Sequence, residues 1–315
     1  MTTGPTAGSP AGAASVDMAI AEERGLKASM ALAVVLSVAA IGLGVWTGSR
    51  VLVLVAEVEV IGVTMSWIAL RASRAVDAGL TERYPYGRDG LTPLLVAVQG
   101  LAFAATIVFA ATDAVIVILE GGGRVGAVIV AAYALVAAVA SVVVAAWLRR
   151  NAEGSELMAA ESARWAGAGI RRFVIAVGAG LAAGLALLAG IEWPLDYIDP
   201  VLVLVACALM APAPVRLLRR GLGELLEGAP DGHTLLAIER AVDGVTGRFD
   251  LPGADVRSTK LGGKLYVDVI YVLDQDTATI GQEDAVRRAV NAALAPLPFD
   301  VWAHVEFTAD PALAE

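Results

Sequence analysis

VLVLVAEVEVIGVTMSWIALRAS, residues 51–73, is the stretch that decides the fold. It is apolar nearly throughout and long enough to cross a bilayer as a helix. Yet it carries Glu57 and Glu59 well inside, and a carboxylate at membrane depth is tolerated mainly where it faces a polar interior. The two acids lie about 200° apart around a helix, so they cannot share one face. The stretch therefore predicts either an ion or proton site or a structural pair with an arginine elsewhere in the chain.

The composition indicates an integral membrane protein. Hydrophobic residues make up 57% of the chain and charged residues 17%, and the mean hydropathy is +0.71. Apolar runs of similar length recur and predict six spans, at residues 26–47, 51–73, 91–119, 125–148, 157–190 and 200–220. The single cysteine, Cys207, lies in one of these runs and behaves as a small hydrophobic residue.

Basic residues predict the orientation of the spans. Eleven lie on one side of the predicted membrane, against Arg50 and Arg124 on the other. The eleven are Arg24, Lys27, Arg71, Arg74, Arg83, Arg88, Arg149, Arg150, Arg216, Arg219 and Arg220. Because cytoplasmic loops carry the excess of Lys and Arg, both termini are expected in the cytoplasm. Residues 1–24, rich in Gly, Ala, Pro, Ser and Thr, are expected to form a disordered leader without the features of a signal peptide.

The spans occupy residues 25–226, and a tail of different character follows in residues 227–315. This tail carries 15 acidic and 7 basic residues, a balance that suits cations and excludes nucleic acid as a partner. Helical spacing near HTLLAIERAVDGV and GQEDAVRRAVNAALAPL alternates with strand patterns near ADVRSTKL, KLYVDVIYVLD and FDVWAHVEF. The order αββαβ predicts a small ferredoxin-like α+β domain, with both helices on one face of a sheet.

Several local stretches, in this order and spacing, resemble the cation diffusion facilitator (cation efflux) family. They are residues 84–88 (YPYGR) with 91–94 (LTPL), 114–122 (AVIVILEGG), 155–165 (SELMAAESARW), 197–200 (YIDP) and 224–230 (ELLEGAP). The resemblance covers about residues 25–310. It implies a multi-pass protein of the cell (inner) membrane that exchanges a divalent metal cation for protons and forms a homodimer through its cytoplasmic tail. It does not imply an enzyme.

The predicted transport site departs from the family pattern. Members place two acids, or an acid with His or Asn, at positions i and i+4 of the second span, and a similar pair on the fifth. Here the resemblance places Glu59 at the inner position of the second span, with Val55 at the outer position. A shift of two residues would bring in Glu57 instead, and both registers stay open. On the fifth span the resemblance is anchored by Glu161, and the ligand positions fall on Arg164 and Ala168.

Arg164 therefore stands where a dication would be bound. A guanidinium is always protonated and can hold a carboxylate by two hydrogen bonds, so we hypothesise that Arg164 neutralises Glu59 or Glu57. The alternative is that Arg164 reaches the water at the cytoplasmic end of its helix. Arg171 and Arg172 lie more than a turn inside the same span, where they are expected to pair with acids or to line a wet cavity, unless the span starts later.

The tail carries the two histidines of the chain, His233 and His304. His304 and Glu306 are two residues apart on a predicted strand and so point the same way. The resemblance implies a regulatory metal site from His233, His304 and Glu306, but a third customary histidine position is Ile270. Metal binding by the tail and ordinary surface roles for these residues both stay open.

Two functions remain at the level of sequence. The first is export of a divalent cation against protons through a carboxylate-based site that uses Glu57 or Glu59 together with Glu161. Oxygen ligands alone favour harder ions such as Mn²⁺ or Mg²⁺ over Zn²⁺. The second is a family member that does not transport, and that regulates or scaffolds an active relative as a heterodimer.

Overall fold

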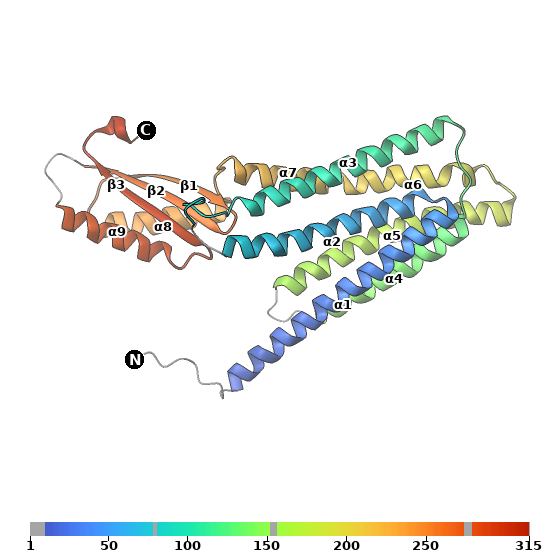
Figure 1. Cartoon of the computed structure of the whole chain (residues 1–315), viewed down its shortest axis with the longest axis horizontal. Coiled ribbons are helices and arrows are strands. Elements are labelled where there is room, and N and C mark those ends of the chain that lie inside the picture. Colours follow the sequence, from blue (N-terminus) through green and yellow to red (C-terminus); the bar gives the residue numbers. More distant parts are fainter. Residues whose placement is uncertain (1–9, 78–80, 152–155, 274–278, 315) are drawn as a thin grey trace. The chain divides into compact units, whose positions relative to one another are not determined.

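A computed structural model describes residues 10–77, 81–151, 156–273 and 279–314 (Figure 1). The chain divides into two compact units, each of two segments. The first contains Met1–Thr64 and Ala102–Pro214, and the second contains Met65–Leu101 and Val215–Glu315. Residues 65–101 therefore group with the tail.

Within the described residues, six helical stretches are long and apolar enough to cross a membrane, as predicted. Their helices are α1 (Pro10–Thr47), α2 (Arg50–Asp77), α3 (Leu91–Leu119), α4 (Ala127–Arg150), α5 (Glu156–Ala189) and, for the sixth, α6 (Pro194–Met210) with α7 (Pro212–Leu225). The protein is thus a multi-pass membrane protein.

Two helices differ from the prediction. α1 is already helical at Pro10, inside the stretch expected to be a disordered leader. Residues 14–24 contain three Ala, two Glu and one Met, which favour helix, so the helix continues toward the N-terminus beyond the apolar span. The sixth span is two helices separated at Ala211. Pro212 and Pro214 have no N–H to donate to the preceding turn, so a new helix starts at Pro212.

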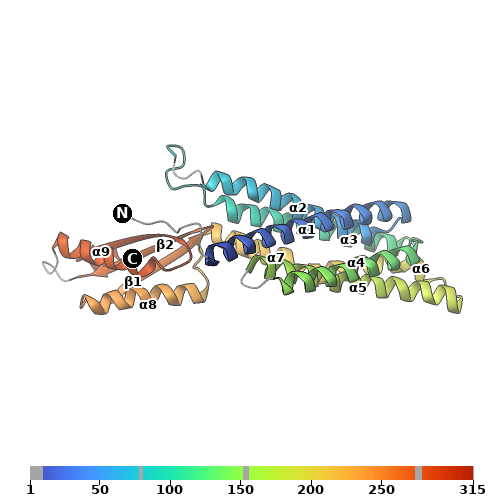
Figure 2. The same cartoon turned by 90° about the horizontal axis from the view of Figure 1, so that it is seen from below.

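The core of the first unit is built mostly from alanines and branched aliphatic residues of α2, α4, α5 and α6, with Ala114 of α3. α4 and α5 lie side by side along most of their lengths (Figure 2). Glycines permit this spacing at the tightest points: a Cβ on Gly169 would lie 3.2 Å from the Cβ of Ser141 on α4. Likewise, a Cβ on Gly178 would lie 2.6 Å from a methyl of Leu202 on α6. Small residues at helix interfaces are the usual means of close packing in membranes.

The tail has the predicted order αββαβ. Its elements are α8 (Gly232–Arg248), β1 (Ala254–Leu261), β2 (Lys264–Val272), α9 (Ile280–Leu294) and β3 (Asp300–Thr308). The strands lie in the order β1-β2-β3, with β1 antiparallel and β3 parallel to the central β2. The inward side chains of β2, Leu265, Val267, Val269 and Tyr271, share one core with α8 and α9, so both helices cover the same face of the sheet.

The two tail helices begin at capping residues that the sequence supplies. The Asp231 carboxylate accepts hydrogen bonds from the backbone N–H of His233 and Thr234 at 3.1 Å each. These bonds, that of Thr234 first, hold the pKa of Asp231 below its usual range. Thr279 and Gln282 form a reciprocal capping box at the start of α9. Such caps supply partners for N–H groups that a helix leaves unpaired.

Candidate functional site

Glu59 lies on α2 more than two turns from the start of the helix, and its side chain is 13% exposed. Ser37 on α1 donates a hydrogen bond from Oγ to Glu59 Oε2 at 2.8 Å. Arg172 on α5 forms an ion pair with the other carboxylate oxygen. Both carboxylate oxygens of Glu59 are therefore engaged inside the first unit, in the polar setting that an acid at this depth requires.

Arg172 is more deeply buried than Glu59, at 4% side-chain exposure. Its Nη1 donates to Ser141 Oγ on α4 at 2.6 Å, and Ser141 in turn donates to the Ala137 carbonyl at 2.6 Å. The guanidinium carbon lies 5.8 Å from the ring centroid of Trp165, within the range of a cation–π contact. Among the described residues, Arg172 Nε has no hydrogen-bond partner although it is buried. A polar network of Ser37, Glu59, Arg172 and Ser141 thus joins α1, α2, α5 and α4.

The hypothesis that Arg164 neutralises Glu59 or Glu57 is wrong. Arg164 is 51% exposed, and its Nε donates to Oε2 of Glu161, three residues earlier on the same helix, at 2.8 Å. Glu161 also accepts hydrogen bonds from Ser29 Oγ at 2.8 Å and from Trp165 Nε1 at 3.0 Å. The neighbour at i−3 is already within reach of a long side chain, so Arg164 has no need to cross to α2.

The arginine that reaches Glu59 is Arg172, eight residues and a little over two turns beyond Arg164 on α5, and so about 80° further around the helix. Its depth inside the span is the sequence signal, and of the alternatives that the sequence leaves open for Arg172 the structure shows pairing with an acid. The neighbouring Arg171 forms no hydrogen bond or ion pair with any described residue.

Glu57 and Glu59 point to different sides of α2, as their spacing predicts. Glu57 is exposed and forms no hydrogen bond or ion pair with the described residues. It lines a cavity of about 440 Å³ together with residues of α1, α3 and α6, among them Phe109 and Asp113. Asp113 pairs there with Arg50, with Nε and Oδ2 2.7 Å apart. Glu59 and Glu161, proposed from the sequence as joint ligands, belong to separate hydrogen-bond groups.

A second buried acid contacts the start of α2 from another helix. Asp199 on α6 is 1% exposed. It accepts hydrogen bonds from Ser49 Oγ at 2.6 Å and from the backbone N–H of Arg50 at 2.8 Å. A weaker contact comes from the N–H of Val51 at 3.4 Å. Asp199 therefore caps the N-terminus of a different helix, where a negative charge is favourable. The sequence showed the Asp-Pro pair but not this role.

The candidate metal ligands of the tail do not gather. His233 is exposed at the start of α8, and His304 lies on β3 with Nδ1 3.6 Å from Asp268 Oδ1 on β2. Glu306 on β3 pairs in the strand register with Ile270 on β2, the position at which the resemblance implies a third histidine. Over the described part of the chain, no three His, Cys, Asp or Glu side chains group as a metal site would require.

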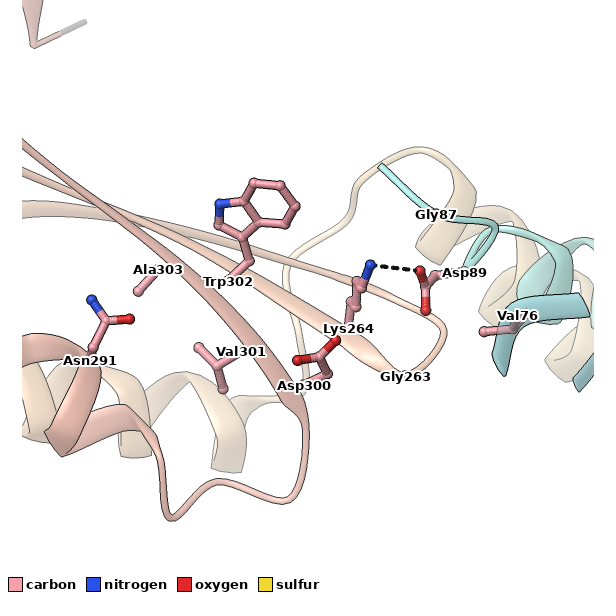
Figure 3. Close-up of a pocket in the computed structure, with 10 residues that line it drawn as sticks. All are labelled: Val76, Gly87, Asp89, Gly263, Lys264, Asn291, Asp300, Val301, Trp302 and Ala303. Carbon is pink, nitrogen blue, oxygen red and sulfur yellow. Dashed lines mark ion pairs between the residues drawn. The ribbon is translucent and has the colours of Figure 1, made fainter. Parts of the chain in front are cut away.

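The second unit has a cavity of about 770 Å³ beside β3, shown in Figure 3. Lys264 and Asp89 point toward one another there, with Nζ and Oδ2 3.1 Å apart, and Lys264 also donates to the Tyr86 carbonyl at 3.2 Å. Burial favours the neutral amine, but the Asp89 carboxylate outweighs it and raises the pKa of Lys264. Asp89 lies just before α3, so this pair joins the loop after α2 to the central strand.

The membrane-spanning part of the chain matches the model of a known protein family. The model of the cation efflux transmembrane domain matches residues 26–226, well over half of the chain. A comparison with curated proteins finds no match. The matched region contains the six apolar stretches together with Glu59, Arg172 and Asp199. The chain belongs to the cation efflux family, and its membrane domain is of the kind that transports metal cations.

Proposed function

We propose that this protein exports a divalent metal cation in exchange for protons, and that Glu59 is the carboxylate that meets the cation. The observation that carries the proposal is the setting of Glu59, whose carboxylate is buried deep in a membrane span and hydrogen-bonded. Acids held in this way mark ion and proton pathways. Glu57 lacks such a setting, because it is exposed. Glu161 is also little exposed and paired with an arginine, but it is the first residue of its apolar span, whereas Glu59 lies well inside its own.

Oxygen atoms supply the side-chain ligands near Glu59. The hydroxyl group of Ser37 lies at hydrogen-bond distance from Glu59, and that of Ser141 lies on the far side of Arg172. Hard oxygen ligands suit Mn²⁺ and Mg²⁺ better than Zn²⁺, which prefers nitrogen and sulfur. We therefore propose that the transported substrate is a hard dication, and we use Mn²⁺ as the test ion in the experiments below.

Proton exchange follows from the chemistry of one carboxylate. An ionised Glu59 attracts a cation, whereas a protonated Glu59 has lost the charge that binds it. Proton and cation therefore exclude each other at this group, and each can drive the other out. A pH gradient across the membrane would then power export.

Glu59→Gln in purified protein reconstituted in liposomes is expected to lower pH-driven Mn²⁺ flux at least tenfold, because an amide carries no charge for a dication. Glu57→Gln is the matched control, since it makes the same change two residues away on the other side of α2, and it should keep most of the flux. The opposite pattern would move the site to Glu57 and refute the assignment to Glu59.

A second candidate function is regulation of an active relative without transport. It is favoured by the neutralisation of Glu59 by Arg172, which leaves no net charge at the proposed site. Two results together would support this role over transport. The wild-type protein alone would move no divalent cation, and an active relative would transport its cation faster when the two proteins are co-expressed.

The proposed direction of export requires both termini to be cytoplasmic, which the distribution of basic residues supports. The test uses a reporter enzyme that is active only in the cytoplasm. Fused after Glu315, this reporter should be active. A second fusion within the loop between α3 and α4, beside Arg124, should be inactive. An active reporter in that loop would reverse the orientation.

The family resemblance, together with the face of the tail sheet that α8 and α9 leave uncovered, supports a homodimer, which we propose as the functional form. Trp302 is 44% exposed on β3 and lies 6.0 Å, centroid to centroid, from Tyr266 on β2, so part of this face is aromatic. The tail has a core of its own. Residues 229–315 expressed alone are therefore expected to be folded and dimeric by light scattering. A folded monomer would remove the tail as the dimer contact.

A further inference from the structure

We propose that Arg172 is a built-in cation that competes with the transported cation for Glu59. A dication can then bind Glu59 only after the ion pair between Arg172 and Glu59 has broken. This inference deepens the proposed function and rests on it. The structure brings the guanidinium of Arg172 against the one buried acid that the described middle of α2 offers to the other helices.

The site of Glu59 and Arg172 has no charge to spare for a dication. Glu59 and Arg172 together carry no net charge, and both are nearly removed from water. A dication added beside the intact pair would meet one negative and one positive charge and leave a net charge of +2 in a medium of low dielectric constant. Repulsion between like charges is strong there, because little solvent screens it. The dication and the guanidinium therefore exclude each other.

Arg172 keeps other contacts when it releases Glu59. Its contacts fall into two sets: the ion pair with Glu59 on α2, and the contacts with Ser141 on α4 and Trp165 on α5. α4 and α5 pack closely, with Gly169 against Ser141, so the second set belongs to one helix pair. A small separation of α2 from that pair breaks the ion pair and leaves the guanidinium hydrogen-bonded to Ser141.

The hydrogen bonding of Arg172 is incomplete. Arg172 Nε is buried and has no hydrogen-bond partner among the described residues. A buried donor without a partner costs free energy. The guanidinium is thus held by Glu59 and Ser141 without using its full set of donors, which fits a group that exchanges partners better than a purely structural bridge.

The expected consequence is measured by calorimetry with Mn²⁺ on purified full-length protein. Arg172→Gln should bind Mn²⁺ at least tenfold more tightly than the wild type, because the competing charge is gone. Arg172→Lys should fall between the two, since a lysine keeps the charge but cannot hold Glu59 and Ser141 at once in the manner of a planar guanidinium. Glu59→Gln with Arg172→Gln should lose the gain, and Arg171→Gln should behave as the wild type.

An affinity of Arg172→Gln no better than that of the wild type would overturn the inference, as would a gain that survives Glu59→Gln. Should Arg172→Gln fail to fold, the comparison of Arg172→Lys with the wild type decides in the same way. The proposed function is tested separately by flux. Flux that depends on Glu59 without any gain in Arg172→Gln leaves transport standing and removes the competition. Tighter Mn²⁺ binding by Arg172→Gln in a protein whose wild type shows no flux would leave the competition standing and remove transport.

Discussion

Arg172→Ala is expected to lower the free energy of unfolding by about 3–5 kcal/mol, the usual loss when one partner of a buried ion pair is removed. The substitution leaves the Glu59 carboxylate buried without its counter-charge and takes a hydrogen bond away from Ser141. Unfolding of the purified protein by titration with a denaturing detergent in mixed micelles, followed by tryptophan fluorescence, measures the change.

The double variant Glu59→Gln with Arg172→Ala should recover part of that loss, because no unpaired charge remains. The interaction free energy from the complete cycle is expected to be well above the scatter of about 0.3–0.5 kcal/mol seen for independent sites. Arg171→Ala is the matched control, being the adjacent arginine without an ion pair to a described residue. Additive losses at Glu59 and Arg172 would show that the two side chains do not depend on each other.

The elements of this fold follow closely from sequence patterns. Runs of twenty or more apolar residues leave little alternative to membrane helices, because a backbone in lipid must satisfy its own hydrogen bonds. In the tail, alternation in β2 predicts the inward set of Leu265, Val267, Val269 and Tyr271. The end of the sixth span was less predictable, because hydropathy averages over the interruption at Ala211 that Pro212 causes.

The candidate site was predicted only in part, for physical reasons. Spacing alone separates Glu57 from Glu59 by side of the helix, but it does not say which side meets the other helices. The partner of Glu59 depends on the relative depth of α2 and α5, which sequence does not give. The family spacing therefore points to Arg164, whereas the partner of Glu59 is Arg172, two turns deeper. The contact of Asp199 with α2 joins residues about 150 positions apart, and no local pattern records it.

Asp199→Ala is expected to lower the free energy of unfolding by about 2–4 kcal/mol, because hydrogen bonds to a charged acceptor are each worth about 1.5–3 kcal/mol and a buried donor left unpaired is costly. The substitution strands the Ser49 hydroxyl and the Arg50 N–H in a region where Ser49 is fully buried. It also removes a negative charge from the N-terminus of α2, where the helix dipole favours one.

Asp196→Ala is the control, since it removes an acid three residues earlier on the same helix. Asp196 pairs with Arg124 at 3.1 Å in a setting where Arg124 is 58% and Asp196 33% exposed, so the loss there should stay within about 1 kcal/mol. Asp199→Asn should fall between the two, because one carbonyl oxygen can still accept from Ser49 or from Arg50 but not from both at full strength. Equal losses at Asp196 and Asp199 would mean that the buried cap of α2 contributes no more than a surface ion pair. The stability of the helix that carries Glu59 would then depend on its packing alone.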